Sequence, residues 1–186
     1  MYTVYTTYEG KPMKKILLLP ILIAIGLHAD VTIGKTLPQV TLDHKNGGYF
    51  SGKAWDASIL KGKTTMLMYV DPDEKDKGES FKPAIEKLER EVNFKHFQIV
   101  VVLNLGATWK PNMLIRKLMK DKLSTYPKRI YVFDNNSLLV KKWGVKNDAY
   151  NVLLIDKKMK PLYSHSGTWK AAEIKKIDSL IRSQVK

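Results

Sequence analysis

Two uninterrupted apolar runs of strand length constrain the fold of this chain more than any other feature. They are Thr64–Val70 (TTMLMYV) and Phe97–Leu105 (FQIVVVLNL). A run that does not alternate with polar residues is typical of a strand covered on both faces, as in parallel sheets. Between the two runs, apolar residues recur at helical spacing from Phe81 to Val92. The sequence therefore predicts a strand, a crossing helix and a second strand, packed as layers of an α/β fold.

The alternation of strands and helices continues to the end of the chain. A helix is predicted to begin at Pro111, because proline is tolerated in a first helical turn, and it carries Leu114, Ile115, Leu118 and Met119. The remaining predicted elements are the strand Arg129–Asp134, the short helix Leu138–Trp143, a hairpin of Asn151–Asp156 and Pro161–His165, and a last helix from about Trp169 to Ser183. This order predicts a sandwich with parallel strands first and an antiparallel pair last.

The segment before the first buried run is predicted to be less regular. Gln39–His44 is strand-like, and Lys45–Gly48 has the composition of a turn, with a return strand beginning at Tyr49. Trp55–Leu60 is expected to form a short helical turn. The glycine pair Gly47-Gly48 is interpreted as part of the turn and not as a phosphate-binding loop, since no Walker-type motif accompanies it.

An N-terminal stretch has the layout of a secretory signal peptide. Met13–Lys15 gives a basic start, Ile16–Leu27 a short apolar run, and Ala29 a small residue at its end. A membrane-spanning helix needs about 20 apolar residues, whereas this run has twelve and contains Pro20 and Gly26. We expect cleavage after Ala29, export to a bacterial periplasm and no stable transmembrane segment afterwards. An uncleaved anchor and a buried core helix are the alternatives.

These signals divide the chain into three parts. Residues 1–12 form an upstream extension of doubtful status, since a leader normally begins at its basic region and Met13 is an alternative start to Met1. Residues 13–29 are the expected signal peptide. Residues 30–186 contain no linker or repeat and have the length of one domain with a sizeable core.

The chain is strongly basic, with a formal net charge of +14. Residues 30–186 keep 29 basic and 17 acidic residues. Such a surplus favours contact with anionic surfaces. The lysines are scattered and are not interleaved with aromatic residues, so no nucleic-acid partner is predicted. An envelope protein or an anionic envelope surface fits better, and the simplest alternative is that lysine only solvates exposed faces.

Two groups of residues carry a resemblance to a known superfamily. Leu60–Lys63 before the first buried run is similar to the entry of the central strand in thioredoxin-like and peroxiredoxin-like secreted proteins. Trp143–Val145, the hairpin and Gly167 before the last helix are similar to the C-terminal half of those proteins. The leader, the length and the absence of cysteine resemble the YtfJ family of small bacterial periplasmic proteins. The resemblance implies a thioredoxin-like three-layer sandwich, with a mixed central sheet, a C-terminal antiparallel hairpin and a final helix. It implies no reaction.

The absence of cysteine excludes the chemistry most often attached to this fold. The resemblance places the two cysteine positions of redox-active relatives near Glu74 and Lys77, and their cis-proline position near Tyr150. A thiolate is both nucleophile and leaving group in disulfide exchange, and neither a carboxylate nor an ammonium group can replace it. Disulfide exchange, disulfide isomerisation and thiol peroxidase activity are therefore excluded.

The loop that replaces the redox motif is the predicted binding surface. Loops at the carboxyl ends of parallel strands are where such folds present their sites. The residues assigned to this surface are Asp71, Asp73, Glu74, Lys75, Lys77, Trp109 and Tyr150. No catalytic residue and no cofactor are predicted.

Other interpretations of the loop remain open. It can be a solvated loop before a helix, or the site of a thiol-independent enzyme with Glu74 or Asp73 as acid or base. A third alternative is an envelope-surface protein bound through its net charge. A calcium site is not predicted, because Lys75 stands at the third ligand position of the pattern begun by Asp71 and Asp73.

Overall fold

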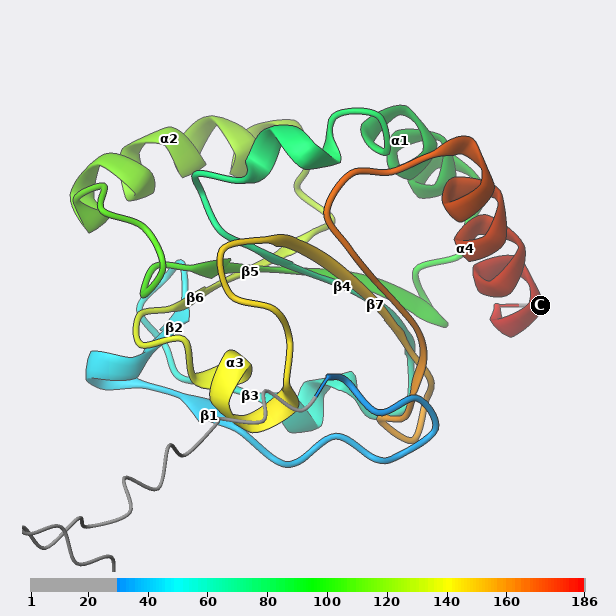
Figure 1. Ribbon diagram of the computed structural model, residues 1–186, viewed down its shortest axis with the longest axis horizontal. Helices are drawn as coiled ribbons and strands as arrows, with labels where there is room; N and C mark the ends of the chain where they lie inside the picture. The colour runs from blue at the N-terminus through cyan, green and yellow to red at the C-terminus, as the bar shows by residue number, and fades with distance from the viewer. Residues whose placement is uncertain (1–29, 186) are drawn as a thin grey trace, which may run out of the picture.

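A computed structural model describes residues 30–185 of the chain. The predictions for residues 1–12 and for the signal peptide at 13–29 lie outside the described residues. The described part is built on a six-stranded sheet of order β2-β6-β5-β4-β7-β8, accompanied by a two-stranded sheet of β1 and β3. Helices α1, α2 and α4 lie on one face of the large sheet, and α3 lies with the small sheet on the other (Figure 1). This is the three-layer sandwich that the sequence predicts.

The elements follow the predicted order along the chain, except that Trp55 and Asp56 form a strand where the sequence predicts the start of a helical turn, because they pair with Leu42 and Thr41. The strands are β1 (Thr41–Leu42), β2 (Gly47–Tyr49), β3 (Trp55–Asp56), β4 (Thr64–Val70), β5 (Phe97–Asn104), β6 (Ile130–Asp134), β7 (Tyr150–Ile155) and β8 (Pro161–Ser166). The α-helices are α1 (Lys82–Glu91), α2 (Asn112–Thr125), α3 (Leu138–Trp143) and α4 (Ala171–Gln184). Short 3-10 turns cover His44–Asn46 (η1), Ala57–Leu60 (η2) and Lys75–Gly78 (η3). The predicted C-terminal hairpin is confirmed as β7 and β8, which pair antiparallel.

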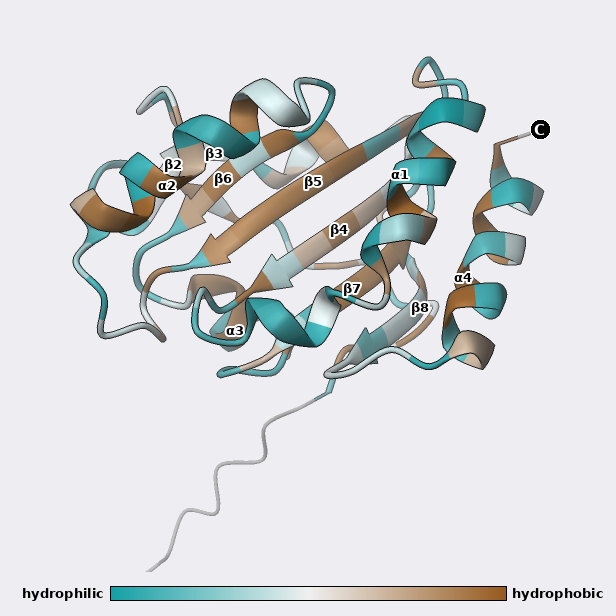
Figure 2. Ribbon diagram, turned by 90° about the horizontal axis from the view of Figure 1, so that it is seen from above, coloured by the Kyte–Doolittle hydropathy of each residue, from teal (hydrophilic) through white to brown (hydrophobic). Residues whose placement is uncertain are grey.

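The two apolar runs form the centre of the sheet. Strand β4 pairs parallel with β5 and antiparallel with β7, and every residue of β4 and β5 is buried. Because side chains alternate along a strand, Met66 and Met68 enter one hydrophobic cluster and Leu67 and Tyr69 the other. Figure 2 shows the resulting apolar centre of the sheet. Burial on both faces explains why the few polar residues of these runs stand at or next to their ends.

The glycine pair near the N-terminus differs from the prediction. Gly47 and Gly48 do not form a turn: they lie in β2, which pairs antiparallel with β6 in the register Gly47↔Asp134 and Gly48↔Phe133. A Cβ atom on Gly47 would lie 1.9 Å from the carbonyl oxygen of Phe133, and the φ angle of Gly47 is +121°. Only glycine fits this close approach of two backbones.

Helix α2 packs on the sheet through only part of its apolar residues. Ile115 and Met119 are buried, whereas Leu114 and Leu118 are 45% and 58% exposed. Residues one position apart differ by about 100° around a helix, so only one of the two apolar stripes can face the sheet. No helix within residues 30–185 is long and apolar enough to cross a membrane.

Candidate functional site

The loop that follows β4 lies at the carboxyl ends of the parallel strands, as predicted. The chain leaves β4 at Val70, passes through Asp71 and η3, and enters α1. The backbone N–H of Asp71 donates to the carbonyl oxygen of Ala149 at 3.0 Å, just before β7. The carboxylate of Asp73 is bonded to Thr108, in the loop after β5. The structure therefore brings together the three segments that follow β4, follow β5 and precede β7.

Asp73 fixes the position of the loop. Its carboxylate accepts a hydrogen bond from the hydroxyl of Thr108 at 2.7 Å and forms an ion pair with the ammonium group of Lys110. These hydrogen bonds, that from Lys110 first, hold the pKa of Asp73 below its ordinary value. Asp73 thus stays ionised, which makes it a poor proton donor but a firm anchor between the two loops.

The two positions expected for the redox cysteines carry opposite charges. The ammonium group of Lys77 forms an ion pair with the carboxylate of Glu74, three residues earlier. Next to this pair, Lys75 contacts Asp76 at 2.6 Å, and both side chains are exposed. Each carboxylate from Asp73 to Asp76 therefore has a lysine partner, and the loop presents a mixed-charge surface to solvent.

Asp71 differs from the other carboxyl groups of the loop because it is buried, with 3% of its surface exposed. It accepts a hydrogen bond from the backbone N–H of Asp73 at 2.9 Å. Burial raises the pKa of Asp71 above its ordinary value, and the negative charges of Asp73, Asp148 and Glu74 add to the increase. Asp71 therefore holds its proton more strongly than an ordinary aspartate, whereas the pKa of Asp73 is shifted in the opposite direction.

Replacing Asp71 with asparagine is expected to stabilise the fold at neutral pH. A raised native pKa means that the ionised form is tolerated less well in the folded than in the unfolded protein. The contribution of Asp71 to the free energy of unfolding should therefore fall as the pH rises above 3.8, the ordinary value, and through the raised pKa of Asp71. Asparagine can accept the same bond from Asp73 but carries no charge.

Urea denaturation curves at acid and neutral pH measure this effect. The Asp71→Asn protein should gain stability over the wild type as the pH is raised, and the gain should shrink towards acid pH. A difference between the two proteins that does not change with pH would contradict a raised pKa at Asp71.

Tyr150 lies beneath the loop and not at its surface. Its side chain is buried, and its hydroxyl group lies 3.4 Å from the sulfur atom of Met68. Burial raises the pKa of Tyr150 to about 12. A Cβ atom on Gly78 would lie 2.3 Å from the Tyr150 ring, so the ring fills the space directly under η3. No peptide bond between residues 30 and 185 is cis. Tyr150 therefore supports the loop from below.

Trp109 is the most exposed aromatic group near this edge, with 83% of its surface accessible. The ammonium group of Lys110 lies 5.8 Å from the centre of its ring. Since Lys110 also holds Asp73, Trp109 stands next to the anchored loop. We define the loop surface as Asp73, Glu74, Lys75, Lys77 and Trp109.

A buried polar network behind the loop surface was not predicted from the sequence. The amide of Asn104 donates to the side-chain oxygen of Asn147 at 2.8 Å and accepts a bond from the hydroxyl of Ser137 at 2.8 Å. Asp134 is fully buried and accepts bonds from the Tyr69 hydroxyl at 3.1 Å and from two backbone N–H groups at the start of α3. Asn104 and Asp134 end strands β5 and β6, whose sequences are otherwise mainly apolar, and they tie the loops at this edge to the sheet.

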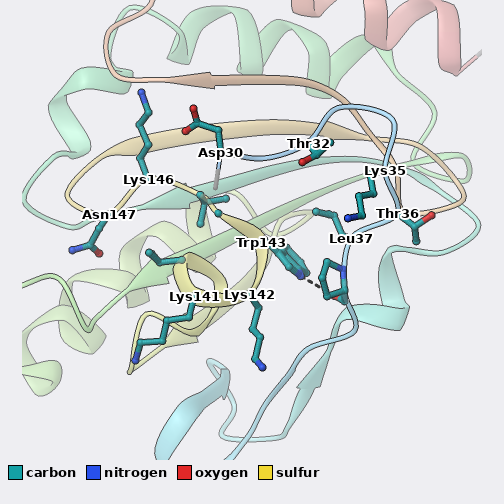
Figure 3. A pocket seen from close by; sticks show the side chains of 14 residues that line it. Asp30, Thr32, Lys35, Thr36, Leu37, Lys141, Lys142, Trp143, Lys146 and Asn147 are labelled. Carbon is teal, nitrogen blue, oxygen red and sulfur yellow. Dashed lines mark hydrogen bonds between the residues drawn. The ribbon is translucent and has the colours of Figure 1, made fainter. Parts of the chain in front are cut away.

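A hollow of about 720 Å³ lies elsewhere, between the N-terminal segment 30–38 and residues 140–147. Leu37 and Trp143 are buried at its base, and four exposed lysines line it: Lys35, Lys141, Lys142 and Lys146. Figure 3 shows that Lys141 and Lys142 extend away from Lys146. None of its lining residues belongs to the loop between β4 and α1, so this hollow is separate from the loop surface.

The solved structures that resemble this chain share its fold. One is a protein of Chlorobium tepidum assigned as the thiol:disulfide interchange protein DsbE, with a TM-score of 0.63 and 20% identity over 84% of this chain and all of that one. Another is the exposed lipoprotein thioredoxin Etrx1 of Streptococcus pneumoniae, with a TM-score of 0.59 and 17% identity over 78% of this chain and 99% of that one. At such identities the likeness establishes a thioredoxin-like fold and nothing about the reaction.

Sequence comparison gives a narrower result. The uncharacterised protein YtfJ of Escherichia coli strain K12 is 21% identical over 140 residues, which are 74% of this chain and 75% of that protein. The family described as "Bacterial protein of unknown function (YtfJ_HI0045)" matches residues 31–184. The match spans nearly all of the described fold, in a chain that contains no cysteine. The chain therefore belongs to the YtfJ family, as a thioredoxin-like protein without thiol redox chemistry.

Proposed function

We propose that this protein is exported to the periplasm and acts there as a binding or accessory protein of the cell envelope, through the loop surface. The observation that carries the proposal is the replacement of the redox motif by the half-buried ion pair of Glu74 and Lys77. The site thus keeps its place at the edge of the sheet but offers fixed charges in place of thiols.

The loop surface has properties that suit recognition of another protein. The bonds from Asp73 to Thr108 and Lys110, together with the Tyr150 ring beneath Gly78, hold the loop in one conformation. A preorganised surface loses little conformational freedom on binding. Charges of both signs beside an exposed tryptophan favour a specific orientation of the partner, because each charge needs its complement. Aromatic residues are also enriched at protein interfaces.

Two features support placement in the envelope. The stretch from Met13 to Ala29 has the composition of a signal peptide. Among the structural relatives, one is described as an exposed lipoprotein and another, from Corynebacterium glutamicum, as a secreted thiol-disulfide isomerase. A cysteine-free chain also needs no oxidation step to reach its folded state in that compartment.

The test is crosslinking within the envelope followed by capture of the protein, with the wild type compared to a Glu74→Ala/Lys77→Ala variant. We expect a discrete partner protein that the wild type captures and the variant loses. The variant should remain folded and lose no more than about 1 kcal/mol of stability, since exposed ion pairs contribute little. Equal capture by both proteins would show that the loop surface is not the binding site.

A matched control separates recognition from general charge effects. The Asp178→Ala/Arg182→Ala variant removes another half-exposed ion pair, on α4. It also removes the contact of Arg182 with Glu91. It leaves the net charge unchanged, as the loop variant does. Capture should survive in this control. If both variants still capture the partner at low salt and lose it at high salt, as the wild type does, binding through the scattered surface charge is favoured instead.

A thiol-independent enzyme at the same edge is the second candidate. The raised pKa of Asp71 favours it, because a carboxyl group that holds its proton more strongly than usual is better suited to act as a general acid. Asp71 is buried, however, and lines neither the hollow described above nor a second one, of about 520 Å³, between residues 30–33 and β8. A binding role is therefore the better supported of the two.

A further inference from the structure

Exposed apolar side chains gather on one segment of the described fold. Five large apolar residues between positions 30 and 185 are strongly exposed: Ile33, Trp109, Met113, Leu114 and Leu118. Four of the five lie within the ten residues that run from the end of the loop after β5 into α2. Single exposed apolar residues are ordinary, but a contiguous group of this kind marks an interaction surface.

These side chains are not needed to hold α2 on the sheet. Ile115 and Met119 are buried against the sheet, with Leu123 packed partly beside them. Met113, Leu114 and Leu118 project away from that contact, in the first two turns of the helix. Figure 1 shows α2 on the outside of the molecule, at the opposite side of this layer from α4. The outer apolar residues therefore have no partner within residues 30–185.

The charges around these residues have one dominant sign. Residues 109–125 contain five basic side chains and a single acidic one, Asp121. Lys117, Lys120 and Lys122 are exposed and form no ion pair with any residue of the described chain. Lys117 stands between Met113 and Leu118 in sequence and in the helical turn. An anionic surface that also accepts apolar groups is the chemical complement of this arrangement.

We propose that this segment docks on a bilayer containing anionic phospholipids. We define the α2 face as Trp109, Met113, Leu114, Lys117, Leu118 and Lys120. Helices that lie in a membrane interface place tryptophan and leucine among the headgroups and upper acyl chains, with lysines directed to the phosphates. Tryptophan prefers the interface itself, because its ring is amphipathic. The α2 face has both halves of this pattern.

The shape and charge of the α2 face favour a bilayer over other occupants. Its apolar side chains spread around a convex helix, and neither of the two hollows that we describe touches it. A bilayer needs no shape complementarity, whereas a protein partner would need a groove that fits the helix. A second copy of this chain would bring another net charge of +14 against the first, which opposes association.

The molecule contains its own reporter for this contact. Trp55, Trp143 and Trp169 are at most 4% exposed, whereas Trp109 is 83% exposed. A change in tryptophan emission on contact with lipid therefore comes mainly from Trp109. Entry of its ring into the interface should shift the emission to shorter wavelength and protect it from quenching by acrylamide.

The experiment compares binding to vesicles of phosphatidylcholine alone with binding to vesicles that also contain phosphatidylglycerol. It uses the full chain purified from a bacterial host, with co-sedimentation and tryptophan emission as readouts. Because all variants keep residues 1–29 unchanged, any contribution of that segment cancels in the comparison. We expect binding and a blue shift only with the anionic vesicles. The Met113→Ser/Leu118→Ser variant should lower the partition coefficient by about tenfold or more, because two apolar side chains no longer enter the interface.

Charge variants with a matched control complete the test. Lys117→Gln/Lys120→Gln should weaken vesicle binding by about tenfold, since each lysine near an anionic surface contributes to attraction. Lys157→Gln/Lys158→Gln removes the same charge from the turn between β7 and β8 and should change binding little. If the two double variants lose vesicle binding equally, the proposal is overturned, because binding then depends on net charge and not on the α2 face.

Two further outcomes would also overturn it. One is vesicle binding without a blue shift, and the other is no binding to lipid while the α2 face is needed to capture an acidic protein. The Glu74→Ala/Lys77→Ala variant should bind vesicles as the wild type does. Failure of partner capture and failure of membrane docking are therefore distinguishable.

Discussion

Replacing Asp134 with alanine is expected to lower the free energy of unfolding by about 3 kcal/mol or more. The carboxylate of Asp134 is fully buried and accepts a hydrogen bond from the Tyr69 hydroxyl at 3.1 Å. It also accepts bonds at 2.8 Å from the backbone N–H groups of Leu138 and Leu139, which open α3. Alanine would leave these three donors without a partner in the interior, and each unsatisfied buried donor is costly.

Urea denaturation of three variants measures this contribution. Asp134→Ala should lose most stability. Asp134→Asn should lose less, because its amide oxygen can still accept one of the bonds. Tyr69→Phe should lose about 1 kcal/mol, since it removes one hydrogen bond and its donor together. A loss of less than about 1 kcal/mol in Asp134→Ala would mean that water satisfies the start of α3 in place of the carboxylate.

Replacing Gly78 with alanine is expected to cost about 2 kcal/mol, within the range for overpacked cores. The added Cβ atom would lie 2.3 Å from two ring atoms of Tyr150, far inside van der Waals contact. Tyr150 is buried in the hydrophobic cluster under α1, α2 and α4 and has little room to move away. The loop should shift instead, which displaces Glu74 and Lys77 and weakens partner capture.

A double-mutant cycle with Tyr150→Leu tests the steric cause. Leucine removes the ring that the new methyl group would meet, so the double variant should be more stable than the sum of the two single changes predicts. Additive effects would show that the Gly78→Ala cost arises elsewhere. Capture by the double variant should recover in part, because the loop can return to its position.

The central strands of the fold could be predicted because a strand buried on both faces appears in the sequence as a continuous apolar run. The sequence of Thr64–Val70 predicts a buried strand, which is β4, and that of Leu138–Trp143 predicts a helix, which is α3. In both segments, the residue type at nearly every position indicates whether that position is buried or exposed. An element can be predicted from its own sequence when its pattern of apolar residues alone decides which of its faces is buried.

The departures arise where distant residues decide the structure. Gly47 and Gly48 have the composition of a turn, but β6 approaches them so closely that only a glycine strand fits beside it. Leu114 and Leu118 have the spacing of a buried stripe, yet Ile115 and Met119 occupy the side that faces the sheet. Periodicity alone cannot rank two apolar stripes of one helix.

The place of the candidate site followed from strand order and resemblance, but its internal contacts did not. The bond between Asp73 and Thr108 joins residues 35 positions apart. Nothing in the local sequence distinguishes the buried Asp71 from the exposed Asp73. Their opposite pKa shifts follow from where β4 ends and where the loop turns outwards.

The position of β4 between β5 and β7 governs the order in which this protein can fold. Strand β4 pairs with β5 across a connection that contains only α1, so the paired residues are near each other in sequence. Its pairing with β7 joins more distant residues: Thr65 pairs with Ile155 and Val70 with Tyr150. Contacts this distant in sequence form slowly, because the intervening chain must be ordered first. While a chain emerges N-terminus first, one edge of the fully buried strand β4 stays open until residue 155 has arrived, and an open apolar edge invites aggregation. Shortening the delay between synthesis of β4 and of β7 should therefore raise the yield of folded protein more than strengthening any contact made by β4 and β5.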